Sequence, residues 1–218
     1  MANLSLTCPQ CGGTFSFTTY PTFDTGDNIL WKEKVRTGEA FLGRCPHCGY
    51  ETHYDYSFLY KERDTHFLMY YAANEEDYKK AYAMMTGQDP MVDGDAISSW
   101  TRRVVTSRED VLEKLMIVDD GLDDRIIEIL KALAFVSLHQ QKPELAVDTV
   151  LFDRGQDGNH YFRFSEKGKV LAAYAFERPM YERVKRSLGE ALGKISENQV
   201  VINSQWAVGV LKAMENSK

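Results

Sequence analysis

Four cysteines in two matching pairs constrain the fold of this chain more than any other feature of its sequence. The pairs lie in the segments Cys8-Pro9-Gln10-Cys11-Gly12 and Cys45-Pro46-His47-Cys48-Gly49. Two residues between the cysteines let both thiolates of a pair point at one ion from a tight turn, and the glycine that follows suits the positive φ of such a turn. Two pairs supply the four thiolates that Zn²⁺ takes in closed structural sites, so we expect one structural zinc ion. The expected ligands are Cys8, Cys11, Cys45 and Cys48.

Three alternatives remain open for these cysteines. Iron would accept the same four ligands, because tetrahedral sulfur coordination suits both metals, but nothing in the sequence indicates an electron-transfer partner. The segment 45–48 alone would fit a thioredoxin-type redox motif, yet residues 50–56 alternate like a strand and no βαβ pattern frames them. Two structural disulfides would require an oxidising compartment, whereas the sequence favours a reducing one.

Length and hydropathy predict a globular protein of one or two domains in the cytoplasm. The chain has 218 residues, of which 44% are hydrophobic and 27% are charged. The richest apolar stretch, residues 126–138, is interrupted by Glu128 and Lys131, so we expect no membrane-spanning helix. Residues 1–7 lack both the basic start and the apolar block of a secretory signal.

The pattern along the N-terminal half predicts a zinc ribbon with an inserted helix. We expect strands over residues 14–20, 40–44, 50–60 and 65–71, and a short helix capped by Asp27 that ends at Gly38. The segment 61–64 reads as a turn. Residues 74–85 form a helix capped by Asn74, residues 87–90 a loop, and residues 102–106 a strand. A capping box of Ser107 and Asp110 then opens a helix that Gly121 interrupts and that resumes from Asp123 to about His139.

The C-terminal part reads as a separate small α+β module. Residues 146–152, 160–164 and 170–176 predict three antiparallel strands, and residues 200–202 a fourth. One helix starts at Pro179 and another is capped by Ser204. The fold class is therefore α+β. The first domain, residues 1–139, is a rubredoxin-like zinc ribbon with a helical extension, and the second, residues 143–218, is an antiparallel sheet with two helices.

The two cysteine motifs and several further positions resemble the CpXC family of bacterial and archaeal proteins. The resemblance covers about residues 1–135 and implies a zinc-ribbon-like domain of uncharacterised activity, with the four cysteines as metal ligands. No catalytic residue is carried over from the family. The further positions are Thr37-Gly38-Glu39-Ala40-Phe41, Tyr60, Asp64, Tyr70, Tyr71, Glu113-Lys114 and Asp123-Asp124-Arg125-Ile126-Ile127-Glu128.

A dense group of carboxylates is the main alternative candidate for a functional site. Oxygen ligands of this kind could hold Mg²⁺ or Ca²⁺, but acidic residues in the first turn of a helix are also favoured by capping and by the helix dipole. We therefore expect a structural role, and an enzyme that uses a divalent metal here is an alternative. The group consists of Asp119, Asp120, Asp123, Asp124 and Glu128.

Histidines and aromatic residues suggest two further sites that we expect to be structural. His47 lies between two cysteines and could replace a thiolate, but four cysteines already complete the site. The other histidines, His53, His66, His139 and His160, have no ligand spacing. The aromatic side chains between residues 50 and 71 could stack nucleic-acid bases, yet only Lys61 and Arg63 accompany them, so core packing is expected.

The charge distribution disfavours general binding to nucleic acid. The formal net charge is −6, and residues 74–140 carry 14 acidic but only 8 basic side chains. Such a region would repel a phosphate backbone. Near the C-terminus the helix that begins at Pro179 carries a mixed charged face, with basic residues Arg178, Arg183, Lys185, Arg186 and Lys194.

Together these observations predict a non-enzymatic zinc-ribbon protein that acts by protein–protein interaction. No nucleophile elbow, P-loop or dinucleotide fingerprint occurs in the sequence. A nucleic-acid-associated transcriptional regulator is the second hypothesis, and the divalent-metal enzyme is the third. A homo-oligomer is compatible with the sequence, which identifies neither the partner nor a small-molecule ligand.

Overall fold

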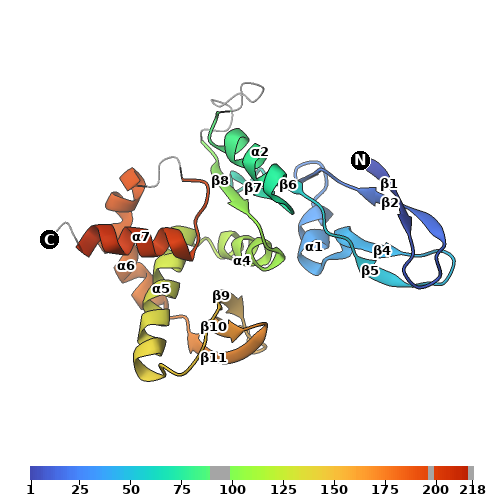
Figure 1. The fold of residues 1–218 in the computed structure, drawn as a ribbon. Helices are drawn as coiled ribbons and strands as arrows, with labels where there is room; N and C mark the ends of the chain where they lie inside the picture. The colour runs from blue at the N-terminus through green and yellow to red at the C-terminus, as the bar shows by residue number, and fades with distance from the viewer. Residues whose placement is uncertain (89–98, 196–198, 216–218) are drawn as a thin grey trace. The chain divides into compact units, whose positions relative to one another are not determined.

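The computed structural model describes residues 1–88, 99–195 and 199–215. The chain is a mixed α+β protein with several separate sheets, as expected (Figure 1). It divides into two compact units, Met1–Arg108 and Glu109–Lys218. Within the described residues no helix is both long enough and apolar enough to cross a membrane.

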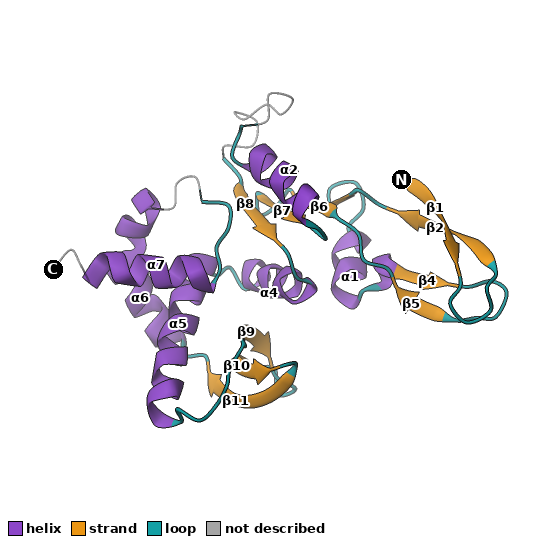
Figure 2. Cartoon of the chain, viewed as in Figure 1, coloured by secondary structure: helices purple, strands orange, loops and turns teal. Residues whose placement is uncertain are grey.

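Two short antiparallel hairpins carry the cysteine turns of the first unit (Figure 2). Strands β1 (Ala2–Thr7) and β2 (Thr14–Thr19) form one hairpin, and β4 (Leu42–Arg44) and β5 (Glu51–His53) form the other. The alternation in β2 places Phe15 and Phe17 on its buried face and leaves Ser16 exposed. The expected strand after the first cysteine turn is confirmed, and the aromatic side chains of its buried face form part of the hairpin core.

A four-stranded sheet forms the rest of the first unit's β structure. Its order is β3 (Thr22–Asp24), β6 (Phe58–Glu62), β7 (Phe67–Tyr71) and β8 (Thr101–Val105). The central pair β6–β7 is antiparallel, whereas both outer strands run parallel to their neighbours. Phe58 and Tyr60 are fully buried and alternate with partly exposed residues, so β6 presents one face to an aromatic core.

Two expected strands of this unit are shorter than the sequence pattern suggested. The predicted strand 40–44 begins as a 3-10 turn, η1 (Glu39–Phe41), before β4. The predicted strand 50–60 divides into β5 and β6, because residues 54–57 leave the hairpin to join the other sheet. The rings of Tyr54 and Tyr56 pack beside Phe17, at 4.8 and 6.1 Å between ring centroids. The alternating aromatic residues of this segment are therefore packed side chains, although the segment does not form one continuous strand.

The helices of the first unit begin and end near the expected residues. Helix α1 (Leu30–Thr37) ends at Gly38, whose φ of 83° is the left-handed conformation that glycine adopts without strain. The expected cap by Asp27 is wrong: the Asn28 side chain accepts the hydrogen bond from the Leu30 N–H, and Asp27 pairs with an arginine of the β6–β7 turn. The cap of α2 (Glu75–Met85) is confirmed, because the Asn74 side chain accepts from the N–H of Asp77 at 2.9 Å.

The second unit contains the long helices and the C-terminal sheet. Helix α4 (Arg108–Asp119) starts at the boundary of the units, Gly121 interrupts the chain with a φ of 63°, and α5 (Asp124–Gln141) follows. Strands β9 (Thr149–Arg154), β10 (His160–Glu166) and β11 (Lys169–Ala175) form an antiparallel meander in the order β11–β10–β9. Helices α6 (Arg178–Ile195) and α7 (Ser204–Glu215) complete the unit.

The division of the chain differs from the predicted boundary at residues 139–143. Helices α4 and α5 belong to the second unit, because Ile126 and Leu130 share one hydrophobic core with Phe152, Phe164 and Tyr181. The apolar stripe of α5 was visible in the sequence, but its partner surface was not.

Two smaller expectations near the C-terminus are also corrected. Val200 and Ile202 form no strand but are buried as single side chains in an irregular segment. The side chain of Asn203, and not that of Ser204, accepts the hydrogen bond from the Trp206 N–H at the start of α7. Part of the predicted loop 87–90, residues 89 and 90, lies outside the described residues.

Candidate metal centre

The two cysteine turns have the same backbone geometry although their first cysteines lie 37 positions apart in the sequence. In the first turn the N–H of Gly12 donates to the Cys8 carbonyl at 2.9 Å, and in the second the N–H of Gly49 donates to the Cys45 carbonyl at 2.9 Å. Each first cysteine also donates its own N–H across the turn, to residues 13 and 50 respectively. The repeated bonds show that the matching sequence motifs form matching turns.

The glycine after each second cysteine has the backbone conformation that the motif predicts. Gly12 has a φ of 72° and Gly49 a φ of 76°. A side chain at either position would adopt this conformation only with strain. The expectation of a positive φ at both positions is therefore confirmed.

The four sulfur atoms lie close together at the ends of the two hairpins. All four are within 4.8 Å of one another. The Sγ atoms of Cys8 and Cys48 are 3.6 Å apart, and those of Cys11 and Cys45 are 3.7 Å apart. A tetrahedral ion with metal–sulfur bonds of ~2.3 Å would separate its ligands by about 3.8 Å. All four cysteines are free thiols, so the geometry fits a metal ion shared by the two turns.

One thiol from each pair faces the interior and the other faces solvent. Cys8 and Cys45 are 1% exposed, whereas Cys11 and Cys48 are exposed. The buried thiols form one small core with Phe15 and Phe17. This core is too small to hold the hairpins together by apolar burial alone, which is the circumstance in which structural metals occur in proteins.

The protonation of the thiols without a metal is uneven. Burial opposes ionisation of Cys8, but hydrogen bonds from the backbone N–H groups of Cys11 and Gln10 lower the pKa of its thiol to about 7. At Cys48 a backbone hydrogen bond from Tyr50 lowers the pKa, but desolvation and the neighbouring thiols outweigh it and raise the pKa to about 12. Thiolates this close repel one another, so a set of four needs a cation between them.

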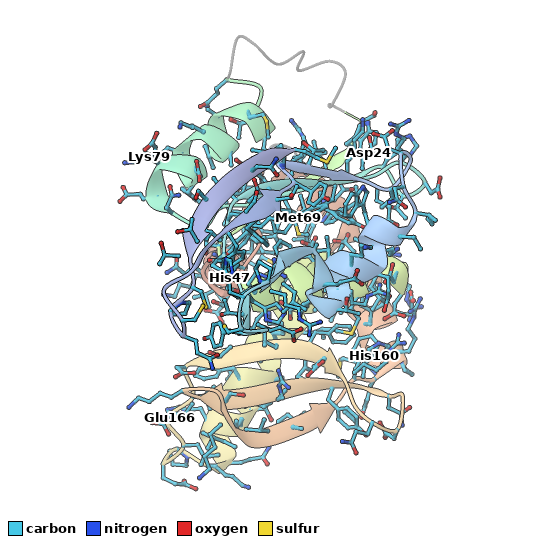
Figure 3. All side chains as sticks on the ribbon, turned by 90° about the vertical axis from the view of Figure 1, so that its right-hand side faces the viewer. Asp24, His47, Met69, Lys79, His160 and Glu166 are labelled. Carbon is cyan, nitrogen blue, oxygen red and sulfur yellow. The ribbon has the colours of Figure 1, made fainter. Side chains whose placement is uncertain are left out.

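His47 is not part of the sulfur cluster. Its Nε2–H donates to the carbonyl oxygen of Thr14 at 3.1 Å, so the second turn is hydrogen-bonded to the start of β2 (His47 is labelled in Figure 3). The metal-ligating group found among the described residues contains the four cysteines and no histidine. The expectation that His47 is not a ligand agrees with this geometry.

Gly13 is a site residue that the sequence analysis missed. A Cβ atom at this position would lie 2.6 Å from Cδ2 of His47 and 3.3 Å from Sγ of Cys11. The imidazole ring therefore occupies the space that any other residue at position 13 would need. The sequence did contain a signal for this role: the first turn ends in two glycines, Gly12 and Gly13, whereas in the second turn the position equivalent to Gly13 is Tyr50.

The carboxylate group at the α4–α5 junction does not converge on one point. Asp123 caps α5 and pairs with Arg125 at 2.6 Å, Asp120 pairs with Arg154 at 2.9 Å, and Asp124 pairs with Lys114 at 2.9 Å. Among the described residues, the potential metal ligands that lie close enough together to hold an ion are the four cysteines and none of these carboxylates. The contacts agree with the expected structural role.

Most of the aromatic residues between 50 and 71, and three of the remaining histidines, pack against neighbouring side chains. Phe58, Tyr60, Phe67 and Tyr71 are at most 3% exposed and so are inaccessible to nucleic-acid bases, whereas Tyr50 is 36% exposed. His160 stacks on a phenylalanine of β9 at 4.9 Å, His139 on one of α5 at 6.2 Å, and His66 contacts Trp100 at 5.3 Å. His53 is exposed beside Gly38.

Comparison with known proteins gave one match. A family model described as CpXC protein matches residues 6–131, which is more than half of the chain. The match includes both cysteine turns and continues through α4 into α5. No curated protein and no solved structure matches the chain.

Proposed function

Because this chain belongs to the CpXC family, we propose that its four cysteines bind one zinc ion with a structural role. The observation that carries the proposal is that the four sulfur atoms lie within 4.8 Å of one another, with two of the Sγ–Sγ distances at 3.6 and 3.7 Å. Four thiolates would complete the coordination of zinc and leave no position for substrate or water. The two hairpins then act as the knuckles of a rubredoxin-like zinc ribbon.

The ion supports folding through the charge that it supplies. Bound zinc would neutralise the mutual repulsion of the thiolates and join two turns that are far apart in the sequence. Apparent binding free energies of roughly 10 to 16 kcal/mol for such sites exceed the net stability of most small domains. Zinc is favoured over iron because nothing in the sequence indicates an electron-transfer partner.

Substitution of one ligand tests this role. Cys45→Ser should abolish zinc retention, measured by elemental analysis of the purified full chain, and should remove the protease resistance of residues 1–73. Ser16→Ala is a matched control, since Ser16 is an exposed residue of the adjacent hairpin. Metal content like that of the wild type in Cys45→Ser, or iron in place of zinc in the wild type, would contradict the proposal.

We also propose that the protein acts by binding another protein and does not catalyse a reaction. A groove of about 540 Å³ in the second unit supports the binding of another protein, because its walls are mainly apolar. Leu133 of α5 and Met180 of α6 line the groove and are 44% and 40% exposed. Exposed apolar side chains that line a groove of this kind are typical of interaction sites.

A photo-crosslinking residue at position 133 tests the interaction. It should capture a specific partner in cells, or a second copy of the chain. The same residue at Glu182, a partly exposed position of α6 that the groove does not include, should capture none. Equal capture at both positions would count against the groove as the binding surface.

A further inference from the structure

Five charged side chains are buried together in the second unit, away from the cysteine turns. They are between 2% and 7% exposed and come from α4 and α5. Charged side chains are almost never fully buried unless they are paired, so their arrangement requires an explanation. The five are Glu113, Lys114, Asp124, Glu128 and Lys131.

Lys131 lies between two carboxylates. Its Nζ donates to both oxygens of Glu113, at 2.9 and 3.0 Å, and to Oε1 of Glu128 at 3.0 Å. Oε1 of Glu113 also accepts from the backbone N–H of Phe152 at 2.6 Å, which ties α4 to strand β9. One ammonium group is therefore shared by two buried carboxyl groups.

Lys114 uses its ammonium group in a similar way. Its Nζ contacts Oδ2 of Asp124 at 2.9 Å, Oε1 of Glu128 at 3.4 Å and the carbonyl oxygen of Ile202 at 2.9 Å. This last bond ties the cluster to the segment before α7. The two lysines together meet three carboxyl groups, so full ionisation would leave one buried negative charge in excess.

One oxygen atom of the cluster has no partner in the described structure. Oε2 of Glu128 is inaccessible to solvent and accepts no hydrogen bond there, whereas Oε1 of the same group has contacts with both lysines. A buried ionised oxygen without a partner is far more costly than a neutral one. The excess charge and the unpartnered oxygen thus both favour a neutral carboxyl group.

We infer that one carboxyl group of this cluster is protonated at neutral pH. The proton makes the cluster electrically neutral, with two carboxylates, two ammonium groups and one carboxylic acid. Burial raises the pKa of Glu113, and although Lys131 opposes this, the carboxylate of Glu128 reinforces it. For Lys131, burial lowers the pKa, but the two carboxylates outweigh burial and the net shift is upward, so this lysine remains charged.

The proton makes the stability of the second unit depend on pH. A carboxyl group whose pKa is raised in the folded state contributes stability that is complete below its unfolded pKa of about 4.3 and is lost as pH rises through the folded pKa. Buried carboxyl groups can titrate as high as about pH 8 to 9. Above the unfolded pKa and until the pH passes the folded pKa, one extra bound proton should therefore increase the unfolding constant up to tenfold for each unit of pH.

The decisive measurement is infrared spectroscopy of the full chain, because it detects a protonated carboxyl group directly. Near neutral pH the wild-type protein should show the carbonyl band of a buried carboxylic acid, with the shift expected in D₂O. Glu128→Gln and Glu113→Gln should both lose this band, because either change makes the cluster neutral without a proton. Glu182→Gln, which removes an exposed carboxylate of α6, should retain it.

Urea unfolding measures the linked change in stability. Trp31→Phe and Trp100→Phe together leave Trp206, which packs against the core of the second unit, as the fluorescent reporter. In this background, above the unfolded pKa of about 4.3, the unfolding constant should rise more steeply with pH than it does with Glu128→Gln added. All histidines are present in both proteins, so their titration is common to both curves.

The outcomes separate the inference from its alternatives. A missing carboxylic-acid band, together with pH dependence that Glu128→Gln does not change, would overturn the inference. If one glutamine variant fails to fold, the other still tests whether the cluster holds a proton. A band that survives both variants would also refute it, because the proton would then belong to another group.

Discussion

Replacement of Gly13 by alanine tests how the two cysteine turns are packed against each other. The added methyl carbon would lie 2.6 Å from Cδ2 and 3.1 Å from Cγ of His47. Carbon atoms pack without repulsion at about 3.5 to 4.0 Å, so the ring has to move by nearly 1 Å. Movement would weaken its 3.1 Å hydrogen bond to the Thr14 carbonyl.

The expected cost of Gly13→Ala is about 1 to 2 kcal/mol. Loss of the hydrogen bond accounts for roughly 0.5 to 1.5 kcal/mol, and residual overpacking beside the Cys11 sulfur adds the remainder. Metal binding and folding of the ribbon are coupled, so this cost should appear as zinc affinity lowered about 5- to 30-fold. Competition with a chromophoric chelator measures that affinity on the full chain.

A double-mutant cycle with His47→Ala isolates the clash. Without the imidazole ring, Gly13→Ala should cost close to nothing, so the two changes should show a coupling of about 1 to 2 kcal/mol. Gly12→Ala is the control, because its methyl would meet no atom within 4 Å and its cost arises from the φ of 72°. If Gly13→Ala lowers the zinc affinity equally with and without the His47 side chain, the reasoning is refuted.

Three other perturbations give outcomes that can be measured directly. Zinc affinity should fall as pH decreases, and the fall should be steeper below pH about 7. Below that pH the Cys8 thiol of the metal-free site takes up a proton that zinc must displace. Chelator competition across pH measures this dependence. Asn74→Ala should destabilise the chain by ~1 kcal/mol in thermal unfolding, whereas Asn74→Ser should retain the cap of α2. Tyr181→Phe should cost about 1 to 3 kcal/mol in urea unfolding, because the buried hydroxyl accepts the Asp123 N–H at 2.8 Å; a cost within error of zero would show that the N–H finds another acceptor.

Local signals in the sequence were sufficient to predict the cysteine turns and most element types. The two CPxCG motifs indicated matching turns with positive φ, because the geometry is determined within five residues. Asn74, Gly38 and Asp123 marked helix ends correctly for the same reason. Asp27 failed as a cap because a distant arginine, Arg63, pairs with its carboxylate at 2.9 Å.

Features that depend on contacts between distant residues could not be read from the sequence. The apolar stripe of α5 predicted a buried face but gave no indication that the partner would be the C-terminal sheet. Nothing in the sequence indicated that Lys114 and Lys131 would be buried against carboxylates from another helix. The second glycine of the first turn acquires its role only when His47 packs over it.

Zinc K-edge X-ray absorption spectroscopy of the purified full chain tests the central claim most directly, because it counts the ligands and measures their distances. The account predicts one zinc ion per chain with four sulfur neighbours at ~2.3 Å. Nitrogen or oxygen atoms in the first coordination sphere, or fewer than four sulfur atoms, would contradict it.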